Sequence, residues 1–125
     1  MWFIVWFFSA SIFGSSIASR AVVIISNMKA KELVRRRVNI AENAFAEIVI
    51  WQVPQSVPGS GHRFKYRLAF VAKGQCVLRY DNEAGKGDHR HIGTLEEAYP
   101  FSNPRQLMAD FFDDITRWRN ENSDS

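Results

Sequence analysis

The clearest hydrophobic pattern in the chain is the strict alternation in RFKYRLAFV, residues 63–71. Its large apolar positions fall on one face of an extended segment: Phe64, Tyr66, Leu68 and Phe70. Its cations fall on the opposite face: Arg63, Lys65 and Arg67. Because successive side chains of a strand point to opposite sides, this period of two predicts a half-buried strand with a cationic outer face.

Three further strands are predicted around this one. The runs 33–40 and 44–53 are rich in β-branched and aromatic residues and are separated by three residues, which predicts a hairpin. Pro54 ends the second strand because it has no N–H for the ladder, and 55–61 (QSVPGSG) reads as a flexible connection. A turn at 72–75 followed by CVLRYD, residues 76–81, predicts a second hairpin.

A single helix is predicted near the C-terminus. Ser102 or Asn103 can cap its N–H groups, and Pro104 suits the first helical position. Apolar residues then recur at helical spacing: Leu107, Met108, Phe111, Phe112, Ile115 and Trp118. We interpret this stripe as the cover of the core, with a partner-binding groove as the alternative. Three acids are expected on the solvated face of the helix: Asp110, Asp113 and Asp114.

Together these elements predict a small α+β domain spanning residues 28–125. It is a four-stranded antiparallel sheet with the C-terminal helix packed on one face and a short helical turn at 28–33. The other face of the sheet would carry the cations of 63–67, joined by Arg35 and Arg37 from the alternating positions of their own strand.

Residues 1–27 form an apolar N-terminal extension whose only charged residue is Arg20. Four interpretations compete: a secretory signal peptide, a membrane anchor, a buried segment of the domain, and a mis-assigned start with translation beginning at Met28. A signal peptide requires cations ahead of its apolar core, and none is present. The segment 2–18 is at the short end of the ~17 to 25 residues that span a bilayer. We favour a start at Met28, with a single-pass anchor holding a cytoplasmic domain as the next choice.

Composition and charge narrow the function classes. The chain of 125 residues, with 46% hydrophobic residues, is the size of one globular domain. Its pI of 9.3 and formal charge of +3 favour an anionic partner. Residues 28–90 hold 12 Lys and Arg against 6 Asp and Glu, whereas 91–125 hold 3 against 7. The lone Cys76 excludes an internal disulfide, which suits a cytoplasmic protein.

The segment GKGDHRHIG, residues 85–93, carries the candidate chemistry. It lies in a stretch, Asn82 to Gly93, that we expect to be a loop. Histidine titrates near neutral pH, so His89 and His91 are candidates for the acid and base of a ribonuclease reaction without a cofactor. Supporting roles would come from the loop's other charged residues, with Lys86 and Arg90 bracing the phosphate and Asp88 orienting one imidazole.

Other uses of these residues stay open. Asp88, His89 and His91, with Asp81 nearby, offer mixed nitrogen and oxygen ligands for a catalytic metal in a metal-dependent hydrolase. A solvated loop without function is a further alternative. A non-catalytic nucleic-acid-binding module would rely instead on the basic strand and its first residue: His62, Arg63, Lys65 and Arg67. In that strand the aromatic residues face away from the cations, which weakens a base-stacking platform.

Three segments together resemble a known family: HRFKYRLAFV, YDNEAGKGDHRHIG and EEAYPFSNPRQLMADFFDDI. They are similar to the TumE-like toxin components of bacterial type II toxin-antitoxin modules, over roughly Met28 to Arg119. The resemblance implies a growth-inhibiting toxin whose partner is a helix-turn-helix antitoxin encoded nearby. It also implies a relationship to RelE-like ribonuclease toxins, and hence an RNA substrate. Members usually start near the position of Met28, so residues 1–27 depart from the pattern.

Overall fold

The computed structural model describes residues 29–82 and 85–123. The interpretations of residues 1–27, including the membrane anchor, lie outside the described residues. Among the residues that are described, no helix has the length and apolar character needed to cross a bilayer.

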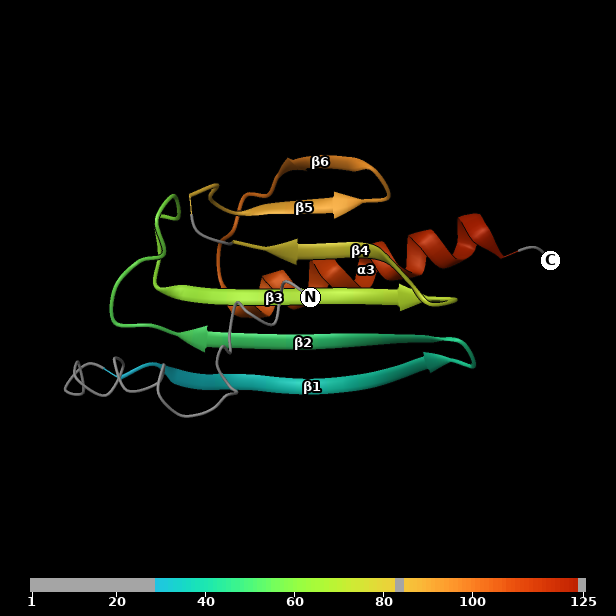
Figure 1. The fold of residues 1–125 in the computed structure, drawn as a ribbon, viewed down its shortest axis with the longest axis horizontal. Coiled ribbons are helices and arrows are strands. Elements are labelled where there is room, and N and C mark those ends of the chain that lie inside the picture. Colours follow the sequence, from blue (N-terminus) through green and yellow to red (C-terminus); the bar gives the residue numbers. More distant parts are fainter. Residues whose placement is uncertain (1–28, 83–84, 124–125) are drawn as a thin grey trace. The chain divides into compact units, whose positions relative to one another are not determined.

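Six antiparallel strands form one sheet, and each strand pairs with the next strand along the chain (Figure 1). In order, the elements are β1 (Lys31–Ala41), β2 (Ala44–Gln52), β3 (Phe64–Ala72), β4 (Gln75–Asp81), β5 (His89–Ile92), β6 (Leu95–Ala98) and α3 (Pro104–Asn122). The helix packs against one face of the sheet over β3 and β4. The predicted α+β fold, an antiparallel sheet with a C-terminal helix on one face, is confirmed.

The sheet has two more strands than the sequence pattern predicted. β5 and β6 form a hairpin from residues that were expected to be a loop and the segment that follows it. The hairpin turns at Gly93, whose φ is +62°. The segment HRHI lacks the apolar alternation that marks a strand, so its pairing with the edge of β4 is a tertiary effect. The predicted helical turn at 28–33 is also wrong, because β1 already begins at Lys31.

Side chains from one face of the sheet and one stripe of the helix form the core. Tyr66, Leu68 and Phe70 of β3 are fully buried, as the alternation predicted. The helix contributes Leu107 and Phe111, both fully buried, and the rest of the predicted stripe packs around them. The helix begins as expected, with the side chain of Asn103 accepting a hydrogen bond from the amide of Gln106 at 2.8 Å.

Of the three helix acids predicted to face solvent, Asp113 is exposed, Asp110 is partly exposed and Asp114 is buried. Asp114 is 5% exposed and accepts hydrogen bonds from the Tyr80 hydroxyl, from Arg90 at 2.8 Å and from Arg117 at 2.7 Å. Asp110 accepts one from the hydroxyl of Tyr99. Helical spacing places these acids beside the apolar stripe, and only the tertiary fold brings hydroxyl and guanidinium donors to them.

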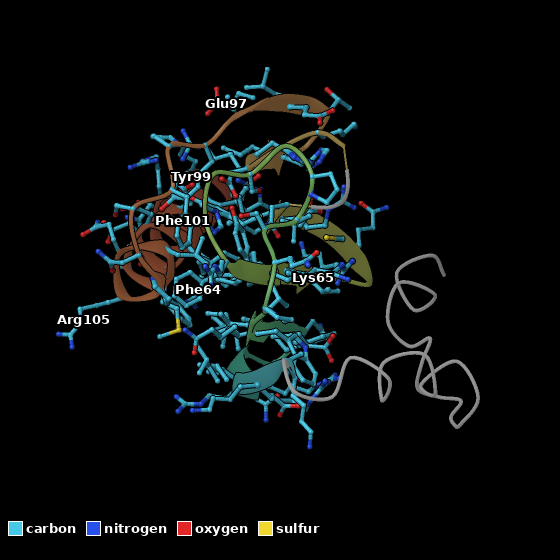
Figure 2. All side chains as sticks on the ribbon, turned by 90° about the vertical axis from the view of Figure 1, so that its left-hand side faces the viewer. Phe64, Lys65, Glu97, Tyr99, Phe101 and Arg105 are labelled. Atoms are coloured by element: carbon cyan, nitrogen blue, oxygen red, sulfur yellow. The ribbon has the colours of Figure 1, made fainter. Side chains whose placement is uncertain are left out.

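The two faces of the sheet carry different side chains. Figure 2 shows Phe64, Tyr99 and Phe101 on the side of α3, and Lys65 on the opposite side of the sheet. We call the face opposite α3 the outer face.

Candidate functional site

Cross-strand pairing brings charged and imidazole side chains together on the outer face. In the register of the sheet, Asp81 of β4 lies opposite His89 of β5, and Arg79 lies opposite His91. Residues directly opposite each other in an antiparallel pair share a face. Between them on β4, Tyr80 points into the core. The four residues Arg79, Asp81, His89 and His91, called the histidine cluster below, therefore lie on the outer face.

His89 has an acceptor at each ring nitrogen. Its Nδ1 is 3.0 Å from the carbonyl oxygen of Gly87, and its Nε2 is 2.9 Å from Oδ1 of Asp81. A carbonyl oxygen only accepts, so Nδ1 carries a proton, and a carboxylate is best served by a second proton on Nε2. The imidazolium form of His89 satisfies both contacts, in a site where His89 and Asp81 are both buried.

His91 has a donor, not an acceptor, beside its Nε2. Its Nε2 is 2.9 Å from Nη2 of Arg79, which can only donate, so Nε2 accepts. Burial lowers the pKa of His91, and the nearby positive charge of Arg79 lowers it further. The two imidazole rings are close, with centroids 4.9 Å apart and planes 73° apart. The cluster thus pairs an imidazole that has an acceptor at each nitrogen with one whose Nε2 accepts from Arg79.

Glu96 and Lys86 lie at the border of the cluster. Oε2 of Glu96 is 3.5 Å from Nε2 of His89 and 3.8 Å from Nε2 of His91. Nζ of Lys86 is 3.3 Å from the same oxygen, and this contact is the main cause of the lowered pKa of Glu96. Lys86, which was predicted to brace a phosphate, therefore lies next to the histidine cluster. The exposed carboxylate of Glu96 lies between Lys86 and the two histidines.

The cluster also offers ligands to a metal ion. Asp81, His89 and His91 each provide one ligand atom, and these atoms lie within 4.8 Å of one another. An imidazole whose other nitrogen donates to a backbone carbonyl, as in His89, is common among metal ligands. Arg79, however, contacts two of the three groups, because its Nε is 2.8 Å from Oδ2 of Asp81 and its Nη2 meets His91. The guanidinium of Arg79 therefore already occupies the ligand atoms of Asp81 and His91 that a metal ion would need.

Asp88 does orient an imidazole, but the imidazole is that of His62. Nε2 of His62 is 2.9 Å from Oδ1 of Asp88, while Nδ1 of His62 accepts from the amide of Phe64 at 3.1 Å. The Tyr66 hydroxyl donates to the same carboxylate at 2.9 Å, and burial and then Asp88 raise the pKa of Tyr66 well above its ordinary value. The ring of His62 stacks on Phe101 at 3.8 Å, so His62 and Asp88 belong to a second cluster on the helix side.

Arg90 lies apart from the two histidines that flank it in sequence. Alternation along β5 directs it to the helix side, where it is 2.8 Å from Asp114, 2.6 Å from Glu97 and 3.2 Å from the Tyr80 hydroxyl. These bonds connect the β5–β6 hairpin to α3. The structure therefore does not bring Arg90 together with the predicted acid and base.

The predicted nucleic-acid-binding residues are divided between the two sides. Lys65 and Arg67 are partly exposed on the outer face, and Arg67 lies opposite Asp81 in the register. Arg63 is exposed just before β3, and His62 belongs to the helix-side cluster. Arg79 and Glu96 were missed as site residues. The alternation of CVLRYD, with Leu78 and Tyr80 buried, placed Arg79 and Asp81 on one face, but only the β4–β5 pairing brings the histidines to them.

Comparison with known proteins assigns the chain to a family. A family model described as "Toxin TumE" matches residues 15–119, a range that begins before Met28 and ends within α3. Neither the curated proteins nor the solved structures that were compared give a significant match. The family match includes the sheet, both clusters and most of the helix. The chain therefore belongs to the TumE toxin family.

Proposed function

We propose that this toxin inhibits growth by cleaving RNA, with His89 and His91 as general acid and general base. The observation that carries the proposal is the different hydrogen bonding of the two neighbouring imidazoles: both nitrogens of His89 face acceptors, whereas Nε2 of His91 accepts from Arg79. Acid and base catalysis by one histidine each typically contributes about 10² to 10⁴-fold. Both rings lie on the face that carries Lys65 and Arg67.

The proposed reaction begins with a proton on each nitrogen of His89 and none on Nε2 of His91. The 2′-oxygen of RNA attacks the adjacent phosphorus and its proton passes to Nε2 of His91. The bond from phosphorus to the 5′-oxygen breaks, and His89 protonates that leaving oxygen. The products are a 2′,3′-cyclic phosphate and a 5′-hydroxyl, so the atoms balance without metal or water. Asp81, which faces His89, would hold the imidazolium in place.

Arg79, which lies on the outer face, would brace the phosphate in place of Arg90, which lies on the helix side. Arg79 donates a hydrogen bond to Nε2 of His91. A phosphate is a stronger acceptor than a neutral imidazole, so RNA would draw the guanidinium away and release the lone pair of His91. Arg79 and Lys86 would then meet the negative charge that develops on the phosphoryl oxygens.

Membership of a toxin family implies an antitoxin partner in general. We propose that this partner is a helix-turn-helix protein encoded beside the toxin and that the toxin acts in the cytoplasm. Co-expression of the adjacent reading frame should restore growth, and a neutral effect of that frame would contradict the pairing.

The test of the ribonuclease proposal is substitution of the two histidines. His89→Gln and His91→Gln should each reduce RNA cleavage by about 10²-fold or more and remove growth inhibition, with the melting temperature showing that the variants fold. His62→Gln, which changes the histidine of the helix-side cluster, is the matched control and should retain cleavage if it remains folded.

Other outcomes identify the alternatives. Full toxicity of both His89→Gln and His91→Gln would contradict the proposal and favour a toxin that acts by occupying its target. Loss of cleavage on treatment with a chelator, and its recovery on adding Zn²⁺ or Mn²⁺, would favour a metal-dependent hydrolase built on Asp81, His89 and His91.

A further inference from the structure

A partly exposed tryptophan, Trp51, accompanies the cations on the outer face. Along β2, the buried residues Ala46, Ile48 and Ile50 point to the core. The alternate positions, which include Val49 and Trp51, therefore point to the outer face. Trp51 is partly exposed there, unlike Tyr66 of β3, which points inward and is fully buried. The aromatic surface that β3 does not provide is thus present on the neighbouring strand.

The register places this indole beside the basic side chains of β3. Trp51 lies directly opposite Lys65, and Val49 lies opposite Arg67, so Arg67 is a diagonal neighbour of Trp51. A second aromatic residue of β2, Phe45, also occupies an alternate position. Its ring is covered by the guanidinium of Arg37, whose Cζ is 3.7 Å from the ring centroid. Trp51 is therefore the β2 aromatic residue that adjoins the Lys65 and Arg67 pair.

We propose that Trp51 stacks on a base of single-stranded RNA whose neighbouring phosphates contact Lys65 and Arg67. An aromatic ring on a sheet next to cations is the usual means by which proteins bind single strands, because every base has a π-face and every nucleotide a phosphate. In a duplex the base faces are already stacked on one another. This inference rests on the proposed function and narrows its substrate to single-stranded RNA.

The position of Trp51 suits a role in binding RNA and not in the cleavage reaction itself. Trp51 is on β2 and the histidines are on β5, three strand spacings apart. At ~4.8 Å between neighbouring strands, this separation is about 14 Å. Arg67 and Asp81 lie between them in adjacent strands. The stacked base therefore belongs to a nucleotide away from the cleaved bond, and losing it should raise KM with little change in kcat.

The test measures binding to an RNA that cannot be cleaved. A labelled 2′-O-methyl oligoribonucleotide lacks the attacking hydroxyl, so its Kd, from fluorescence anisotropy at fixed salt, is independent of catalysis. Trp51→Leu should raise the Kd for the single strand by about 5- to 150-fold, and Trp51→Phe should restore most of the affinity. Trp118→Leu, which removes an indole on the helix side, is the control and should leave the Kd unchanged in folded protein.

Two results would overturn the inference. One is a Kd for Trp51→Leu equal to that of the wild type. The other is an equal loss of affinity for the single strand and for a duplex of the same sequence, which would show that stacking is not involved. Failure of the histidine variants to affect cleavage would overturn the ribonuclease proposal but would leave these binding constants as they are.

Discussion

At the scale of single residues, neighbours rather than residue type decide what the histidines can do. His89 and His91 are two positions apart in the chain, and both side chains lie on the outer face of the sheet. His89 lies between the Gly87 carbonyl and Asp81, whereas His91 receives a hydrogen bond from Arg79. Identical side chains thereby take different hydrogen-bonding arrangements, which is what a pair of groups with different roles requires.

The pKa of His91 tests whether its neighbours set its protonation state. Burial and Arg79 lower it, and His89 adds to this, while Glu96 and Asp81 oppose it. In the unfolded chain His91 takes up a proton near pH ~6.5, and in the folded protein it does so at lower pH. The stability that depends on neutral His91 is therefore fully present above about pH 6.5 and is lost as the pH falls toward the folded pKa.

Arg79→Gln should raise the pKa of His91 toward 6.5, because it removes a positive charge beside the ring. Titration of the His91 ring proton by NMR would measure the change, with the His62 signal as the internal control. A His91 pKa that is the same in both proteins would show that Arg79 does not set its protonation state.

At the scale of elements, the connection between β4 and β5 positions His89. Its backbone is tied to the connection between β2 and β3, since the amide of Gly85 donates to the carbonyl of Pro58 at 3.0 Å. Gly87 has φ +79° and packs against Gly59, and its carbonyl oxygen accepts a hydrogen bond from Nδ1 of His89. The position of His89 thus depends on contact between two loops far apart in sequence.

Gly87→Ala should therefore affect both stability and activity. The Cβ would lie 2.8 Å from the carbonyl oxygen of Gly59, in a backbone conformation that L-residues rarely adopt. We expect a loss of about 1–3 kcal/mol in the free energy of unfolding, measured in urea, and slower RNA cleavage. Gly85→Ala is the matched control: its φ is +91°, but no atom lies within 4 Å of the added Cβ, so it should lose less of both.

At the scale of the whole molecule, the two faces of the sheet carry different side chains. One face is closed by α3 and contributes stability through the core. The outer face carries the histidine cluster, with Lys65 and Arg67 on the neighbouring strand. Figure 2 shows Lys65 on the outer face and Arg105 on the opposite side, beside α3.

Salt dependence should distinguish the two faces. Lys65→Gln is expected to weaken binding of the uncleavable RNA to a similar extent for all sequences, and to reduce the slope of log K against log salt by about 1. Arg105→Gln makes an equivalent change of charge at an exposed residue of the helix and should leave the slope unaltered. Equal effects of the two variants would mean that net charge, and not the outer face, controls binding.

Much of the fold and part of the site could be predicted from local pattern. The alternation in RFKYRLAFV and the helical spacing after Asn103 determined β3 and α3, because periodicity and capping act over a few residues. The same alternation put Lys65 and Arg67 on the outer face. The resemblance of three segments was enough to indicate the toxin family, which the family match confirms. The roles of the histidines remain predictions.

Only the tertiary structure decided how the loop residues are used. HRHI has no strand pattern of its own and becomes β5 by pairing with β4, and this pairing sends His89 and His91 to one face and Arg90 to the other. It brings Arg79 and Asp81 to the histidines, while Asp88 meets His62 from another loop. The physical reason is that local sequence specifies which way a side chain alternates, whereas its partners come from strands and loops that meet only after folding.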